Sequence, residues 1–238
     1  MTEWFEEWFG EEYLHLYPHR DEADAGRLLD LIRRSVPWQA HWRVLDVACG
    51  AGRHMRAITE AEGLPIGLDL SISLLRRARE VTSRPLIRAD MRRLPIRPGS
   101  MHLTLNLFTS FGYFATDEEH QDALAGMVAT LQQGGWFVLD FLNAEQVRAH
   151  LVPREASEIA GTTVEITRRL SEDGRFVRKS ITTREGREFM ERVRLFSAGD
   201  LRRMLGACGL RIGQSYGDYA GNPLDGSSAR TILIGQRQ

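Results

Sequence analysis

The sequence predicts an α/β fold, a doubly wound and mostly parallel seven-stranded sheet with a small antiparallel β-sheet inserted into it. Between residues 43 and 141, five short apolar runs alternate with segments of helical periodicity. Parallel neighbouring strands need such crossover elements between them. Between residues 162 and 196, apolar and polar residues alternate instead, as is typical of antiparallel strands with one buried face.

The elements of the main sheet follow from local patterns. The apolar spacing from Leu28 to Val36 predicts a helix that ends near Pro37. Strands are expected at 43–47, 64–69, 85–89, 101–107 and 135–141, and helices at 52–61, 71–83 and 117–132. Ser71 is expected to cap its helix, and Gly134-Gly135 to form a stop and turn after the last of them.

The pattern changes after Asn143. The runs VEITRRL, RFVRKSITT and FMERVRLF, separated by EDG and REG turns, predict the inserted antiparallel sheet. A helix is then expected from Ser197, and the last two strands at 210–216 and 230–235. We therefore expect three parts, a helical segment over 1–39, a main domain over 40–149 and 197–238, and an inserted antiparallel sheet over 150–196.

The composition narrows the classes of function. The 238 residues carry 31 basic and 32 acidic side chains, a net charge of −1, which argues against an overall electrostatic footprint for nucleic acid or an anionic membrane. The arginines between Arg76 and Arg97 are interpreted as a solvated face. Cys49 and Cys208 have no disulfide or metal spacing, and the acidic N-terminus lacks the pattern of a secretory signal. We expect a cytoplasmic protein without a metal.

The strongest motif is VLDVACGAGRH, residues 44–54, in which a strand runs into a turn and then a helix. Glycine at Gly50 and Gly52 lets the backbone approach a ligand, and the helix N-terminus offers free amide donors. Asp69, nineteen residues after Gly50, can accept both hydroxyls of a ribose. Asp90 and Met91 follow the third strand, where the acid could accept from an adenine amino group and the apolar residue could cover the ring. The aromatic loop NLFTSFGYF, 106–114, follows the fourth, so four strand ends carry candidate ligand groups.

In combination, these motifs over about residues 40–142 resemble the class I S-adenosylmethionine-dependent methyltransferases, of the bacterial small-molecule type. The resemblance implies S-adenosyl-L-methionine as the cofactor, bound by residues 40–149 and 197–238, with residues 1–39 as a cap over it and residues 150–196 as a substrate lid. It implies a set of cofactor-binding residues: Ala48, Gly50 and Gly52 beside the methionine part, with Asp46 shaping the loop; Asp69 at the ribose; Leu70, Asp90 and Met91 at the adenine; and Leu107 and Phe108 beside the sulfonium. In the N-terminal stretch YLHLYPHR it implies that Tyr17 and Arg20 contact the cofactor carboxylate.

The acceptor pocket is predicted from the aromatic loop and from the end of the chain. Phe111 and Tyr113 are expected in its wall, and the resemblance places Tyr219 and Arg230 near it. Methyl transfer is an in-line displacement that needs mainly orientation and a dry site, with a base in some cases. Tyr113, Asp140 and Tyr219 are all candidates for such a base.

Three other functions would share some of these sequence features. A nicotinamide-dependent oxidoreductase shares the strand, the Gly-x-Gly and the later acid, but Met55 replaces its third glycine. For an RNA or protein methyltransferase, the loop after the fourth strand lacks the Asn-Pro-Pro-Tyr type of motif that grips a flipped base, and no RNA-binding module is evident. Cofactor binding without catalysis is the third. We expect a small-molecule methyl acceptor and no nucleic acid or membrane partner, in a monomer or homodimer, and leave open whether N, O or C is methylated.

Overall fold

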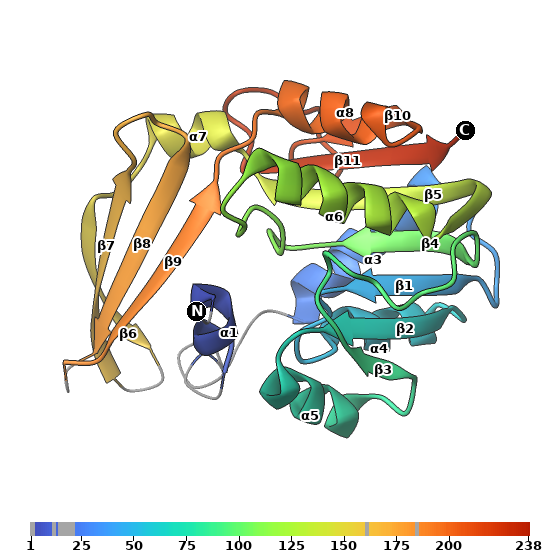
Figure 1. Cartoon of the computed structure of the whole chain (residues 1–238), viewed down its shortest axis with the longest axis horizontal. Coiled ribbons are helices and arrows are strands. Elements are labelled where there is room, and N and C mark those ends of the chain that lie inside the picture. The colour runs from blue at the N-terminus through green and yellow to red at the C-terminus, as the bar shows by residue number, and fades with distance from the viewer. Residues whose placement is uncertain (1–2, 11–12, 14–21, 160–161, 184–185) are drawn as a thin grey trace.

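The computed structural model describes residues 3–10, 13, 22–159, 162–183 and 186–238, and its main body is one seven-stranded sheet (Figure 1). The strands are β1 (Arg43–Val47), β2 (Leu64–Asp69), β3 (Leu86–Arg88), β4 (Met101–Asn106), β5 (Leu131–Leu142), β10 (Leu210–Tyr216) and β11 (Arg230–Arg237). Their order is β10-β11-β5-β4-β1-β2-β3. All pairs are parallel except those of β11 with β5 and β10, which confirms the predicted fold class.

Helices cover both faces of this sheet. The helices of the described residues are α1 (Trp4–Trp8), α3 (Glu22–Ser35), α4 (Arg53–Glu60), α5 (Ile72–Val81), α6 (Asp117–Ala129), α7 (Ala144–Ala149) and α8 (Ala198–Ala207), of which α3 and α4 pack on one face and α6 and α8 on the other. The core divides accordingly. Alternate strand residues such as Leu45 and Leu139 pack with α6 and α8, whereas Val44 and Val138 pack with α3 and α4, because successive side chains of a strand point to opposite faces.

The boundary between α6 and β5 differs from the prediction. The helix ends at Ala129, and Gly134 and Gly135 lie inside β5 rather than in a turn before it. The register with β4 shifts there, from Met101 opposite Leu131 to Leu103 opposite Trp136. Gly134 has φ +73°, and a Cβ on Gly135 would lie 2.9 Å from the Gln132 carbonyl oxygen. The glycines therefore permit a bulge at the start of the strand.

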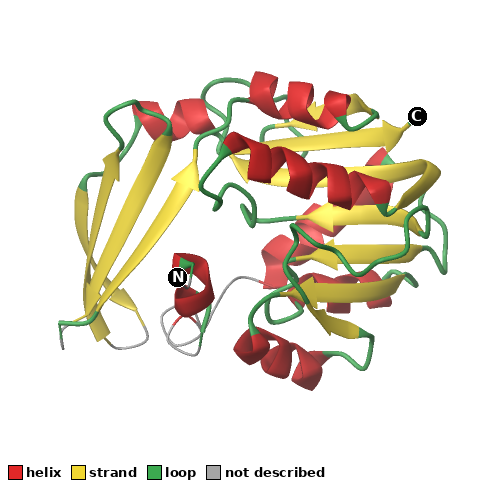
Figure 2. Ribbon diagram, viewed as in Figure 1, coloured by secondary structure: helices red, strands yellow, loops and turns green. Residues whose placement is uncertain are grey.

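The inserted sheet stands beside the main body, as Figure 2 shows. It consists of β6 (Arg154–Ile159), β7 (Thr162–Leu170), β8 (Phe176–Thr183) and β9 (Glu188–Arg194), all antiparallel and in chain order. The three alternating runs of the sequence became β7, β8 and β9, and β6 is a further strand. The short helix α1 lies between this sheet and the main body (Figure 1).

Within the described part of the chain, no helix is long and apolar enough to cross a membrane.

Candidate functional site

A cavity of about 1280 Å³ lies at the carboxyl ends of β1, β2, β3 and β4. These four strands are neighbours in the sheet, so the segments that follow them meet at one edge, where open α/β sheets bind ligands. The predicted residues that line this cavity are Ala48, Gly50, Asp69, Leu70, Asp90, Met91, Leu107, Phe108 and Tyr113. Phe5 of α1 and Phe9, the residue that follows this helix, line one side of the cavity.

The two glycines of the first turn have different tasks. Gly50 has φ +56°, and a Cβ built on it meets nothing within 4 Å, so it leaves open space in the cavity wall. Gly52 has φ +85°, and its Cβ would lie 3.1 Å from the Ala78 Cβ of α5. Gly52 is not among the described residues that line the cavity. The structure therefore gives Gly52 a packing role in place of the cofactor contact that the resemblance implied. The absence of a side chain at this position lets α4 begin close to α5.

Asp69 ends β2 and connects the first turn to the next helix. Its Oδ2 accepts a hydrogen bond from the Gly50 amide at 2.8 Å, and its Oδ1 accepts one from the Ser71 amide at 2.8 Å. The side chain is buried. Burial raises the pKa of Asp69, although the amide hydrogen bonds oppose this. The carboxylate thus holds two segments of the cavity wall in place while it faces the cavity.

Asp46 lies beneath the same turn and does not itself line the cavity among the described residues. It is 1% exposed, and its Oδ2 has no hydrogen-bond partner. Burial raises the pKa of Asp46 to about 7, which the charge of Arg53 opposes. His54, on the cavity wall, stays neutral because burial and Arg53 lower its pKa to about 3. A buried carboxyl group next to a cation therefore lies beneath the cavity wall.

Asp90 is fixed by a residue that the sequence analysis assigned to a solvated face. The Asp90 carboxylate accepts hydrogen bonds from Arg92 Nε at 2.9 Å and Arg92 Nη2 at 2.7 Å. Arg92 also donates to Glu119 at 2.9 Å and lies 3.6 Å from Glu3 beside α1. Burial would raise the pKa of Asp90, but Arg92 lowers it. Arg92 thus joins this end of the cavity to α6 and to the N-terminal segment, and only part of the arginine-rich stretch is a solvated face.

A second cavity, of about 470 Å³, lies between the inserted sheet, α7 and the loop after β4. Phe9, Phe108 and Tyr113 line both cavities, so the two adjoin at these three rings. Arg230, which was predicted near the acceptor pocket, lines the second cavity. The inserted sheet contributes charged side chains to the same wall, among them Arg168, Lys179 and Glu191. The sequence carries no signal for these three side chains, because nothing local distinguishes them from exposed strand residues.

Asp140 and Tyr219 form a buried network behind Phe108. The Asp140 carboxylate accepts hydrogen bonds from Arg230 Nε at 2.8 Å, from the Phe108 amide at 2.9 Å and from Tyr219 Oη at 2.9 Å. Neither Asp140 nor Tyr219 is among the described residues that line the two cavities. Burial and Asp140 raise the pKa of Tyr219, so its phenol stays protonated. The structure therefore gives both candidates for the base a supporting role behind the cavity wall. The same holds for the predicted place of Tyr219 near the acceptor pocket, because its side chain lines neither cavity among the described residues.

This network supports an unusual backbone. Phe108 has φ +58° and Thr109 φ +60°, a conformation that costs free energy in residues other than glycine. Arg230 Nη2 donates to Thr109 Oγ1 at 3.0 Å. The Phe108 ring lies 4.2 Å from the Arg53 guanidinium and 5.4 Å from that of Arg230, measured from Cζ to ring centroid. Hydrogen bonds and cation–π contacts thus compensate the strain and fix the ring between the two cavities.

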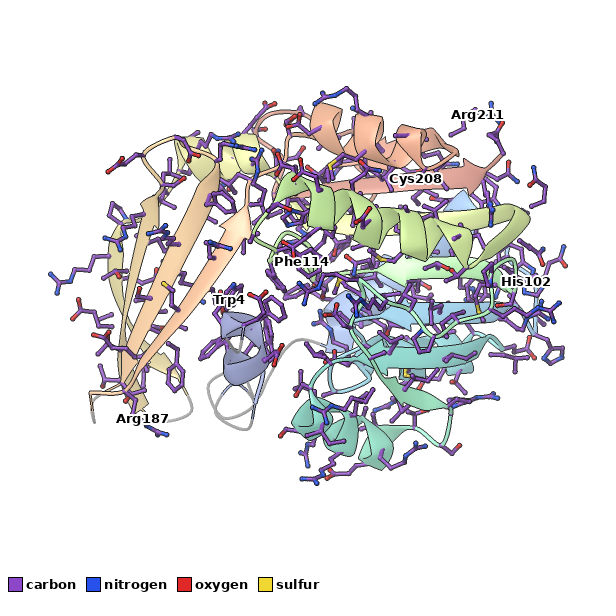
Figure 3. The ribbon with its side chains drawn as sticks, viewed as in Figure 1. Trp4, His102, Phe114, Arg187, Cys208 and Arg211 are labelled. Carbon is purple, nitrogen blue, oxygen red and sulfur yellow. The ribbon has the colours of Figure 1, made fainter. Side chains whose placement is uncertain are left out.

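Phe111 does not belong to the acceptor pocket, contrary to the prediction. It is 1% exposed, and its ring centroid lies 5.7 Å from Phe196 and 5.1 Å from His120. The chain turns inward after the strained pair, so this ring fills the core under α6. In the same loop, Phe114 also packs in the core and lies with Trp4 in the region between the two sheets, where Figure 3 labels both. Tyr17 and Arg20 lie outside the described residues.

This chain is similar to known proteins both in sequence and in fold. A family model described as a methyltransferase domain matches residues 44–135. A dTDP-3-amino-3,4,6-trideoxy-alpha-D-glucopyranose N,N-dimethyltransferase of Streptomyces venezuelae is 28% identical over 221 residues, covering 85% of this chain and 88% of that protein. A dTDP-3-amino-3,6-dideoxy-alpha-D-glucopyranose N,N-dimethyltransferase of Streptomyces fradiae is 30% identical over 207 residues, covering 82% and 78%.

Solved structures of methyltransferases have the same fold as this chain. An S-adenosylmethionine-dependent methyltransferase from Clostridium acetobutylicum superimposes with a TM-score of 0.81 at 15% identity, covering 95% of this chain and 98% of that one. DesVI of Streptomyces venezuelae superimposes with a TM-score of 0.70 at 25% identity, covering 95% and 96%. Together with the strand-end site, these relatives show that the chain belongs to the class I S-adenosylmethionine-dependent methyltransferases and transfers a methyl group from this cofactor to a small-molecule acceptor.

Proposed function

We propose that the enzyme methylates the amine of a nucleotide-linked amino sugar, with the cofactor in the first cavity and the acceptor in the second. The observation that carries the proposal is the common wall of the two cavities at Phe9, Phe108 and Tyr113. A ligand in each cavity would meet its neighbour at this wall. The amino-sugar class is supported by two curated relatives that are N,N-dimethyltransferases of dTDP-linked amino sugars.

The first cavity offers a donor and acceptor set that fits S-adenosylmethionine. Asp69 supplies carboxylate oxygens for the ribose hydroxyls, and the open space at Gly50 leaves room for the methionine part. Asp90, held ionised by Arg92, can accept from the adenine amine. Ala48, Leu70, Met91 and Leu107 supply the apolar part of the wall. When bound, the cofactor supplies an electrophilic methyl group on a sulfonium with a good leaving group.

The chain itself supplies orientation and a dry environment. The Asp140 network keeps the Phe108 ring at the boundary between the cavities. Tyr113 Oη donates to the Thr109 carbonyl oxygen at 2.5 Å, so its remaining lone pairs can accept a hydrogen bond from an amine. Tyr113 is the only one of the three base candidates that lines a cavity among the described residues. We assign it the orientation of the acceptor amine.

The three parts of the chain take distinct roles in this proposal. Residues 40–149 and 197–238 hold the cofactor, residues 1–39 form the cap, and residues 150–196 form the lid. The cap connects the other two, because the Trp8 ring lies 4.8 Å from Phe189 of β9 while Trp4 lies 5.2 Å from Tyr113, measured between ring centroids. This arrangement limits the access of water to the boundary between the cavities.

The test is methyl transfer from isotopically labelled S-adenosylmethionine to matched acceptors, followed by mass spectrometry. A dTDP-3-amino-dideoxyglucose should gain label, while the analogue with a hydroxyl in place of the amine should not. Tyr113→Phe should lower the rate with the amino sugar by a larger factor than it weakens cofactor binding, which is measured by calorimetry. Equal labelling of the hydroxyl analogue would refute N-methylation. Absence of any transfer to the amino sugar by protein that binds the cofactor would refute the acceptor class.

A further inference from the structure

The face of the lid that lines the second cavity carries a row of charges between two apolar rows. In the register of β7, β8 and β9, residues directly opposite each other share a face, and so do residues two positions apart. Three successive rows on this face are Ile166–Ile181–Phe189, Arg168–Lys179–Glu191 and Leu170–Val177–Val193. We call the middle one the charged row. All three of its members line the second cavity.

Packing does not account for the charged row. The apolar row on one side joins Trp8 and Tyr13 in a hydrophobic cluster, and Val177 and Val193 on the other side join the main core. The lid is thus attached to the protein on both sides of the row. The side chains of Lys179 and Glu191 are each only 19% exposed. Withdrawing charges from water costs free energy, so a face that merely sealed the cavity would be apolar throughout.

The charges within the row have defined neighbours. Arg168 Nη2 lies 2.7 Å from Glu155 Oε1 on β6, and Lys179 Nζ lies 3.7 Å from Glu191 Oε2. Trp8 Nε1 donates to Glu191 Oε1 at 2.7 Å, which holds that carboxylate from the side of the cap. Arg168 and Lys179 are direct cross-strand partners. Glu155 and Glu191 line the same cavity and balance these two cations, so a phosphate would bind by exchanging carboxylate contacts for its own and by using the remaining N–H donors of Arg168 and Lys179.

We propose that Arg168 and Lys179 form a subsite for the phosphoryl groups of the methyl acceptor. This inference rests on the proposed nucleotide-linked acceptor and assigns the residues that would recognise its anionic part. The planar fork of arginine can donate two parallel hydrogen bonds to a phosphate, and lysine adds a compact charge. The cavity volume of about 470 Å³ lies within the ordinary range for small-molecule sites. An acceptor bound at the charged row lies in the same cavity as Tyr113 and Phe108.

The chain offers a matched control on the same two strands. Arg169 and Arg178 are also direct cross-strand partners, but they point to the opposite face and are exposed. They have the same charge and lie next in sequence to Arg168 and Lys179 without lining the second cavity. Neutralising them changes the net charge of the lid equally and leaves the charged row intact.

The experiment measures binding of thymidine diphosphate, inorganic pyrophosphate and thymidine by calorimetry. Arg168→Gln and Lys179→Met should each weaken binding of both phosphate compounds by about tenfold or more, and Lys179→Arg should retain most of it. Thymidine and cofactor affinities should stay within about twofold. Arg178→Gln and Arg169→Gln should leave all affinities unchanged, and melting temperatures confirm that each variant is folded.

Phosphate affinities that do not change in Arg168→Gln and Lys179→Met would overturn the subsite, and so would equal losses in the outer-face controls. Because the two variants act on separate side chains, either one that folds decides the question. Failure of the proposed function is seen elsewhere, as absence of methyl transfer by the wild-type protein. A wild-type enzyme that methylates amino sugars while Lys179→Met binds pyrophosphate normally would refute only the subsite.

Discussion

Replacing Asp140 by asparagine is predicted to destabilise the protein by about 3–5 kcal/mol, because it removes one partner of a buried ion pair. The Asp140 side chain is 0% exposed and that of Arg230 is 19% exposed. Burial alone would lower the pKa of Arg230, but Asp140 outweighs this and raises it. Without the carboxylate, Arg230 remains a charged group with little access to water. The loss is a large share of a typical total stability of about 5–15 kcal/mol.

Two further variants separate the charge from the hydrogen bonds. Tyr219→Phe removes only one donor to the carboxylate and should cost about 1.5–3 kcal/mol. Combining Asp140→Asn with Arg230→Met removes the uncompensated cation, so the double variant should be more stable than the sum of the two single losses predicts. The measurement is urea unfolding followed by tryptophan fluorescence, with comparable m-values in all variants.

The result that would refute this reasoning is an Asp140→Asn protein within about 1 kcal/mol of wild type. Strict additivity of the Asp140→Asn and Arg230→Met losses would contradict the coupling. A base at Asp140 predicts a different outcome, in which the turnover rate collapses while stability is unchanged. The strained backbone at Phe108 provides a second readout, since its amide donates to Asp140 at 2.9 Å and loss of this anchor should lower the turnover rate together with stability.

Three other predictions follow from single side chains. Asp69→Ala should weaken cofactor binding about tenfold or more, or about 1.4 kcal/mol, through lost charge-assisted hydrogen bonds; an unchanged affinity by calorimetry would contradict the ribose assignment. Burial raises the pKa of Asp46 from 3.8 to about 7, so its contribution to stability is full below about pH 4 and is lost as the pH rises through 7. The melting temperature of Asp46→Asn relative to wild type should therefore increase between pH 4 and pH 8, and a constant difference would argue against a buried protonated group. Phe111→Ala should lower the free energy of unfolding by about 3–5 kcal/mol without changing KM for the acceptor. A raised KM would indicate that this ring lines the acceptor pocket after all.

The cavity at the carboxyl ends of the strands could be predicted because its signals are local. The first turn, with Gly50, and the end of β2, with Asp69, are each recognised within a few residues, and neighbouring parallel strands bring their carboxyl ends to one edge. The hydrogen bond between the Gly50 amide and Asp69 is a consequence of that arrangement. Gly52 shows the limit, because its packing against Ala78 depends on how closely α5 approaches.

The position of the aromatic loop could be predicted from the sequence, but the separate roles of its aromatic residues could not. Phe108 and Phe111 stand three residues apart in the same apolar sequence. One lines both cavities and the other fills the core. The difference arises from positive φ at Phe108 and Thr109, which is stabilised by Asp140, more than thirty residues later in the chain. The full role of Arg92 could not be predicted for a similar reason, since Asp90 is a neighbour in sequence but Glu119 lies on α6.

The sequence by itself determined the fold class, the order of the elements and the edge at which the ligand groups gather, because periodicity and turn residues act over a few positions. Only the tertiary structure decided which side chains reach the cavities and which support them from behind. The charged row is the clearest case. Arg168, Lys179 and Glu191 stand on three strands, and only their pairing register makes them neighbours. Burial and register are set by long-range packing, which no local pattern encodes.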